Sequence, residues 1–157
     1  MTNLPNCGCP ESPWVQRAQD YIAAHATIPD DAAKVETLRF LLNGHCGLAN
    51  RVPIDQAVDH LQGLGNRTNR EEFQHSILGD LKREGTLATL IYSGGLGGLF
   101  IPCDDSEIEG VARQVFARVI GELANLRGMT VHTPRIHQVV DETIQQVQQQ
   151  SSRILDG

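Results

Sequence analysis

Cysteine and histidine side chains, which suit metal binding or nucleophilic chemistry, gather at two places in the chain. Cys7 and Cys9 form a C-x-C pair, and His45 and Cys46 are adjacent. Such side chains bind zinc, and C-x-C is a known ligand spacing, although an adjacent His-Cys is an awkward second pair. The simpler interpretation is that these three cysteines and Cys103 are unrelated thiols. Both interpretations stay open at this point, and no metal is assigned.

Three further patterns suggest enzymatic chemistry, and each has a simpler explanation. His45 and Cys46 make a poor base-nucleophile pair, because adjacent side chains usually point apart. The segment 94–98 (GGLGG) leads into a predicted strand, so it offers no helix N-terminus to a phosphate. The acidic run 104–109 suggests a metal-dependent nuclease, but a charged helix start explains it with fewer assumptions. We therefore expect neither an enzyme nor a bound cofactor.

The composition limits both the core and the partners. Hydrophobic residues make up 40% of the 157 residues and aromatic residues only 4%, so the core must be aliphatic, which favours helices. Lys and Arg number 13 against 19 Asp and Glu, so the chain does not coat nucleic acid through bulk charge, although a local patch remains possible. Without a secretory signal or a long apolar run, we expect a cytoplasmic protein with reduced thiols and no membrane partner.

Helices and one hairpin must position any site. Ser12 followed by Pro13 is typical of a helix start, and Gly85 of a helix end. Two short apolar runs, 87–92 and 99–101, flank a glycine-rich tip and predict a β-hairpin. Apolar residues at helical spacing predict helices over 13–25, 31–43, a short segment opened by Pro53, 69–84, 106–127 and 135–155.

We expect three parts in the chain: an N-terminal arm and helix (1–29), a central domain (30–128) and a polar C-terminal helix (129–157). In the first part, Trp14 and Tyr21 either pack on their own domain or form a dimer surface. In the last part, a 4-3-4-3-4 spacing indicates a weak coiled-coil seam, or else a helix that packs on its own domain or is a partly disordered tail. That series consists of Ile136, Val140, Thr143, Val147, Gln150 and Ile154.

From Leu38 to about Met129, this order of elements resembles the winged helix-turn-helix DNA-binding proteins common in phages and mobile elements. The landmarks are the segments 41–44 (LLNG), 52–55 (VPID), 81–85 (LKREG) and 91–102 (IYSGGLGGLFIP). The resemblance implies a mainly α fold with a small β-hairpin wing. A winged helix-turn-helix core would then carry flanking N- and C-terminal helices.

The resemblance implies that the predicted 69–84 helix enters the major groove of DNA. With Phe73, Ile77 and Leu81 turned inward, the residues expected to face the groove are Thr68, His75, Ser76, Lys82 and Arg83. The residues expected to touch phosphates are Arg51, Arg67 and Arg70. The expected wing tip consists of Ser93, Gly94, Gly95, Leu96, Gly97 and Gly98, and it carries no Lys or Arg.

The function that the resemblance implies is sequence-specific binding of double-stranded DNA. We expect a homodimeric transcriptional regulator or accessory factor, with the long helix after the wing able to pair with its copy. The alternative is a winged helix that docks proteins without binding DNA, since the same fold serves both roles. It would use Tyr92, Leu96 and Leu99 of the uncharged wing together with the Gln-rich last helix.

Overall fold

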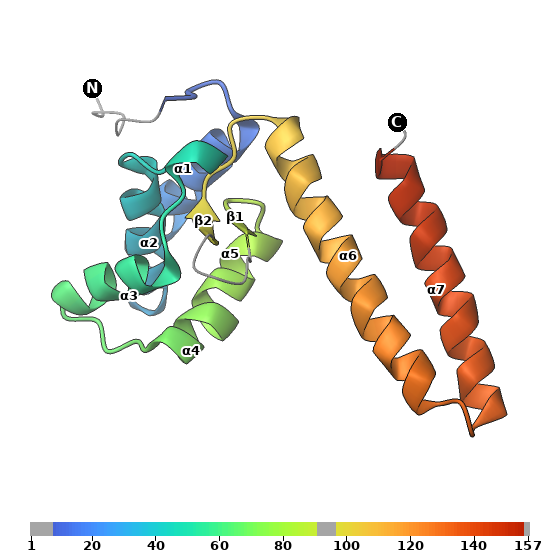
Figure 1. The fold of residues 1–157 in the computed structure, drawn as a ribbon. Coiled ribbons are helices and arrows are strands. Elements are labelled where there is room, and N and C mark those ends of the chain that lie inside the picture. Colours follow the sequence, from blue (N-terminus) through green and yellow to red (C-terminus); the bar gives the residue numbers. More distant parts are fainter. Residues whose placement is uncertain (1–7, 91–96, 156–157) are drawn as a thin grey trace. The chain divides into compact units, whose positions relative to one another are not determined.

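The computed structural model describes residues 8–90 and 97–155 of the chain. It divides into two compact units, Met1–Ile108 and Glu109–Gly157. The division falls inside one long helix, α6 (Asp105–Met129) (Figure 1). The described residues are mainly helical and include one small antiparallel hairpin, which confirms the predicted fold class. No helix among them is both long and apolar enough to cross a membrane.

The helices of the first unit begin and end close to the predicted residues, because their caps are local. The Ser12 side chain accepts a hydrogen bond from the backbone N–H of Val15 at 3.4 Å, as an N-cap does. Gly44 and Gly85 follow helices with positive φ, which suits glycine. The described helices are α1 (Pro13–His25), α2 (Ala32–Leu42), α3 (Ile54–Gly63) and the consecutive segments α4 (Arg70–Glu72), η3 (Phe73–Leu78) and α5 (Gly79–Arg83).

A two-stranded antiparallel sheet follows these helices. Strand β1 (Ala88–Leu90) pairs with β2 (Gly98–Phe100), with Thr89 opposite Leu99. The other edge of β2 is also occupied, because Val52 and Leu99 exchange two backbone hydrogen bonds of 3.0 and 2.9 Å. The connector between α2 and α3 is thus held against the hairpin, an arrangement compatible with a winged helix.

The core of the first unit is aliphatic and includes α1. Tyr21 is 7% exposed within the core, and Trp14 packs against the same cluster. The sequence left two roles open for these aromatic side chains. In the structure they pack within their own unit. Other core members are Leu38, Leu61, Phe73, Leu81 and Leu99, each at most 1% exposed.

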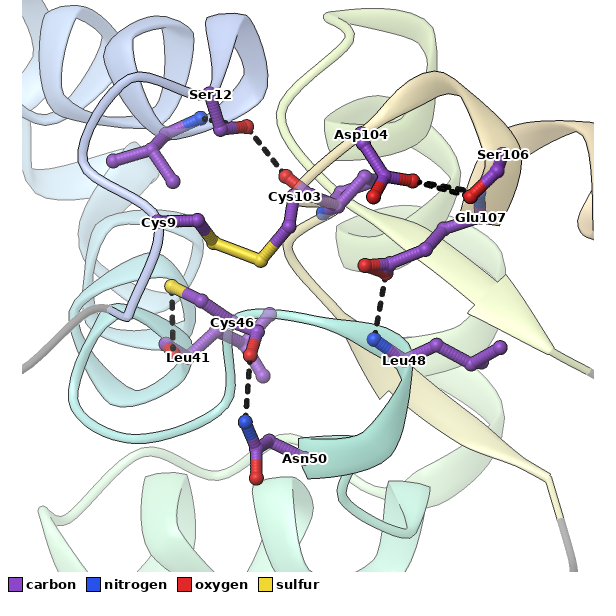
Figure 2. The surroundings of a disulfide bond; sticks show 12 residues. Cys9, Ser12, Leu41, Cys46, Leu48, Asn50, Cys103, Asp104, Ser106 and Glu107 are labelled. Atoms are coloured by element: carbon purple, nitrogen blue, oxygen red, sulfur yellow. Dashed lines mark hydrogen bonds between the residues drawn. A yellow bond between two sulfur atoms is a disulfide. The ribbon is translucent and has the colours of Figure 1, made fainter.

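A disulfide joins Cys9 to Cys103, whose Cα atoms lie 5.5 Å apart although 94 positions separate them. Beside it, the Ser12 hydroxyl donates to the carbonyl oxygen of Pro102 (Figure 2). The expectation of reduced thiols is therefore wrong: of the described cysteines, Cys9, Cys46 and Cys103, none is a free thiol. Nothing in the sequence indicates this pairing, because only the fold brings the two cysteines together.

The second unit contains most of α6 and a second long helix, α7 (Pro134–Leu155). α7 turns back after a short connection (Figure 1). The turn is held by an ion pair of 2.6 Å between Arg127 Nε and Asp141 Oδ1. His137 supports it too, with Nδ1 lying 3.1 Å from the carbonyl oxygen of Arg127.

Candidate nucleic-acid interface

The candidate interface is built on one continuous helix, residues 70–83, formed by α4, η3 and α5. It starts at Asn69, whose side-chain oxygen accepts from the N–H of Glu72 at 2.8 Å. It ends at Gly85, whose N–H donates to the carbonyl oxygen of Lys82 at 3.1 Å. These hydrogen bonds satisfy backbone groups that the ends of a helix otherwise leave unpaired, and they stabilise the 70–83 helix.

Its inner face anchors this 70–83 helix to the core. Phe73, Ile77 and Leu81 are buried, as predicted, and Leu78 is buried beside them. The middle segment, η3, is a π-helix, and its wider turn allows two adjacent side chains to face inward. Such π turns often occur at functional sites, because they change the direction in which neighbouring side chains point.

Four of the predicted side chains are exposed and available. His75 and Ser76 lie on the π turn, Lys82 near the C-terminal end, and Arg67 just before the helix. None of them has a hydrogen bond or ion pair with another described residue through its side chain. The two cations, Arg67 and Lys82, are suited to phosphates. His75 and Ser76, which lie between them in the sequence, can form hydrogen bonds with base edges.

Three predicted arginines are already engaged within the protein. Arg70 Nη1 lies 3.1 Å from Asp55 Oδ1 on α3. Arg83 pairs with Asp80 one turn earlier. Arg51 is half-buried, and its Nη1 donates to the carbonyl oxygen of Leu48 at 3.0 Å. To bind phosphates, these arginines would have to share their present hydrogen-bond partners with a phosphate or exchange them for it.

Thr68 corrects the predicted outer face. We expected it to point outward, but it is only 4% exposed. Its hydroxyl donates to the carbonyl oxygen of Asn69 at 3.4 Å, and its own N–H donates to the side chain of Asn66 at 3.0 Å. Thr68 precedes the helix, so the rotation of 100° per residue that predicted its direction does not apply there.

The hairpin also differs from the predicted wing. Ser93, Gly94, Gly95 and Leu96 lie outside the described residues, as does Tyr92. Gly97 is partly exposed, whereas Gly98 is buried within β2 instead of forming part of the tip. Leu99, expected to contact a protein in the alternative function, is 0% exposed. Its side chain belongs to the hydrophobic core of the first unit, and its backbone pairs with Val52, contacts that the local sequence does not reveal.

Basic side chains from other helices pair with two acidic side chains, Asp80 in the 70–83 helix and Glu84 just after it. Lys34 Nζ on α2 lies 2.7 Å from Asp80 Oδ2, and Arg17 Nη2 on α1 lies 3.0 Å from Glu84 Oε2. Hydrogen bonds from Lys34 and then Arg83 lower the pKa of Asp80 below its ordinary value. Sequence reasoning missed Lys34 and Arg17, because nothing in a single chain indicates which distant cation meets which carboxylate.

The acidic segment before α6 is a helix cap. Asp104 Oδ1 accepts hydrogen bonds from the Ser106 hydroxyl at 2.6 Å and from the Glu107 N–H at 3.1 Å (Figure 2). These bonds lower the pKa of Asp104. Glu107 Oε2 in turn accepts from the N–H of Leu48 at 2.6 Å. The simpler of the two interpretations, a charged helix start, accounts for these residues.

The residues weighed as zinc ligands do not assemble in the described part of the chain. The sulfur of Cys9 is bonded to Cys103, and His45 Nδ1 lies 2.9 Å from the carbonyl oxygen of Asn50. Cys7 lies outside the described residues. Among the residues that are described, no three His, Cys, Asp or Glu side chains form a group that suits a metal ion.

A comparison with curated proteins finds one clear relative. Over 130 residues the chain is 45% identical to the "Putative control protein C.MjaVP" of Methanocaldococcus jannaschii, covering 80% of this chain and 78% of that protein. No family model matches the chain. No solved structure matches it either.

Proposed function

We propose, on the premise that this chain belongs to the same family as "Putative control protein C.MjaVP", that it regulates transcription. In this proposal it binds specific sequences of double-stranded DNA as a homodimer. The relative is named "Putative control protein", and we extend the role in that name to this chain. In this proposal the protein is a regulator and not an enzyme. The observation that carries the DNA-binding proposal is the exposed face of the 70–83 helix, whose His75, Ser76 and Lys82 side chains have no partner among the described residues.

The chemistry of that face divides its residues into two roles. Arg67 and Lys82 are cations with no partner among the described residues, so they are proposed to bind phosphates. His75 and Ser76 lie between them on the π turn and are proposed to contact base edges. Gly79 is half-exposed on the same helix, where the absence of a side chain permits a close approach.

The local charge balance limits the strength of this interface. Residues 67–84 contain four basic side chains (Arg67, Arg70, Lys82, Arg83) and four acidic ones (Glu71, Glu72, Asp80, Glu84). Asp80 and Glu84 are neutralised by cations from α2 and α1, which leaves Glu71 and Glu72 against the two unpaired cations. We therefore propose a moderate affinity that depends clearly on salt.

The first test is a salt series of binding to random duplex fragments, followed by mobility shift. A slope of log K against log salt of about −4 or steeper, roughly five phosphates neutralised, supports DNA binding and justifies selection of a specific site. Absence of binding even at about 50 mM salt contradicts DNA binding, since nonspecific phosphate contacts are strongest at low salt.

Variants of the four unpartnered residues test the assignment. We expect Arg67→Ala and Lys82→Ala each to weaken binding to all sequences and to reduce the salt slope by about 1. We expect His75→Ala and Ser76→Ala to change the preferred bases instead, by about 1–3 kcal/mol at the affected position. Arg39→Ala is the matched control, because Arg39 is an exposed arginine on α2.

If all four variants bind DNA as the parent does at low salt, these residues are not the interface. A second candidate function would then gain support, a winged helix that docks a protein. The observation that favours it is the engagement of Arg70 and Arg83 with carboxylates, which reduces the positive charge available to DNA. Its Gln-rich contact helix would be α7.

A further inference from the structure

The helical hairpin of the second unit has one face whose apolar side chains are covered to a large degree. On α6, this face carries Phe116, Ile120 and Leu123, all partly buried. On α7, Val140 is 4% exposed. Ile144 and Val147, about one and two turns further along α7, are partly buried. In this unit α6 and α7 are the only long helices described, so these residues mark the side that each turns towards the other.

A second set of apolar side chains in the same hairpin is exposed. On α6, Val115 is 53% exposed, Val119 39% and Leu126 38%. On α7, Ile136 is 52% exposed and Val139 58%. Large apolar side chains that are exposed singly are ordinary, but a contiguous group usually marks an interaction surface.

These five exposed residues lie on one side of the hairpin. At about 100° per residue, the exposed set of each helix lies roughly a quarter turn from its covered set, in the same rotational sense on both helices. α7 runs back in the direction opposite to α6 (Figure 1). Equal offsets on antiparallel helices point to the same side of the pair. We call the resulting surface the hairpin face: Val115, Val119, Leu126, Ile136 and Val139.

We infer that the hairpin face is covered by the same face of a second copy of this chain, so that two α6–α7 hairpins form a four-helix bundle. This inference rests on the homodimer of the proposed function and names its contact surface. Bundles of this kind bury one apolar face of each helix in a common core.

The side of the hairpin that carries this face is large enough for a dimer interface. The part of α6 within the second unit, Glu109 to Met129, is about 30 Å long at 1.5 Å per residue, and two helices side by side are about 20 Å wide. One whole side of the hairpin, which includes the hairpin face and its polar border, therefore measures on the order of 600 Å² in projection, and more as accessible surface. Stable interfaces bury about 800 Å² on each partner.

Charge at the border of the face favours a second copy over another occupant. Arg118 and Glu122 lie one turn apart on α6, beside Val119, and neither has an ion pair with another described residue. When two α6 helices cross antiparallel near residue 120, Arg118 of each copy meets Glu122 of the other. The border is thus complementary to itself, as an interface with twofold symmetry requires.

The test is the molar mass of the full chain by light scattering after size-exclusion chromatography, over a range of concentrations. We expect the parent to be a dimer. We expect Val119→Glu and Val139→Glu to raise the dimer dissociation constant by roughly 30-fold or more, as loss of an interface anchor does. Ala117→Glu is the matched control, since Ala117 is exposed on the opposite side of α6, and it is expected to stay dimeric.

Charge reversal separates pairing from simple loss of folding. Arg118→Glu should weaken the dimer by bringing like charges together, and the double variant Arg118→Glu/Glu122→Arg should restore it. Equal helix content by circular dichroism shows that each variant folds. A monomeric parent, or a Val119→Glu variant as dimeric as the parent, overturns the inference, because the hairpin face is then covered by something other than a second copy.

The outcome is independent of DNA binding, which is measured separately. A dimeric parent that fails to bind DNA contradicts the proposed DNA-binding function and leaves the hairpin dimer intact. A monomeric parent that binds DNA contradicts the hairpin dimer and the homodimer of the proposed function, and leaves DNA binding intact.

Discussion

At the scale of single residues, the sharpest constraint lies where two backbones approach each other at Gly98. A Cβ atom added at this position would lie 2.7 Å from the carbonyl oxygen of Val52, which is held by its hydrogen bond to Leu99. Backbone atoms cannot move aside as the end of a flexible side chain does. Only glycine therefore fits where the connector meets the hairpin.

We expect Gly98→Ala to lower the free energy of unfolding by about 1–3 kcal/mol, as overpacking of a buried site does. Urea unfolding followed by circular dichroism measures it. Gly63→Ala is the control, because a Cβ there meets no atom within 4 Å. It should be neutral or slightly stabilising, by up to about 1 kcal/mol. Equal stability of the two variants would show that the strand can shift to accommodate a side chain.

At the scale of elements, the 70–83 helix is attached to α2 by a polar contact at its surface. Lys34 Nζ and Asp80 Oδ2 are 2.7 Å apart, and their side chains are 21% and 43% exposed. The hydrogen bond from Lys34 lowers the pKa of Asp80, and the same bond raises the pKa of Lys34. This contact helps to hold the proposed DNA-binding helix in position.

The direction of these shifts predicts a pH dependence. Because the pKa of Asp80 is lower in the folded state than its ordinary 3.8, its contribution to stability is present above that value and is lost as the pH falls through the folded pKa. We expect Asp80→Asn to be less stable than the parent at about pH 7, and the unfolding free energies of the two proteins to converge in acid.

Urea unfolding at several pH values checks this expectation. Asp59→Asn is the control, since Asp59 is exposed and has no ion pair within the described residues. A difference between Asp80→Asn and the parent that stays constant down to acid pH would show that ionisation of Asp80 does not matter.

At the scale of the whole molecule, the Cys9–Cys103 disulfide closes a loop that spans most of the first unit. A cross-link between residues 94 positions apart restricts the unfolded chain strongly. It fixes the loop before α1 to the segment that leads into α6. The hydrogen bond from Ser12 to the carbonyl oxygen of Pro102 acts on the same two segments (Figure 2).

We expect the double variant Cys9→Ser/Cys103→Ser to lose about 2–5 kcal/mol of unfolding free energy. Urea unfolding of parent and variant without reductant measures the loss. Repeating both in strong reductant is the control, because the parent then lacks the cross-link too and the difference should vanish. A variant as stable as the oxidised parent would mean that the disulfide contributes nothing to folding.

Local features of the sequence determined the elements of this protein. Helix starts at Ser12 and Asn69, helix ends at Gly44 and Gly85, and the apolar stripe of the 70–83 helix are all set by contacts within a few residues. The same short-range rules predicted the hairpin and the exposure of His75, Ser76 and Lys82, because helical periodicity separates the two faces of a helix.

Only the tertiary structure decided which distant residues meet. It joined Cys9 to Cys103, brought Lys34 and Arg17 to the acidic side chains near α5, and placed Val52 against β2. It also gave Asp80, which already pairs with Arg83 within one turn of its own helix, a second cation from α2. The reason is physical: capping and periodicity act over one or two turns, whereas pairing between distant segments depends on how the chain as a whole packs.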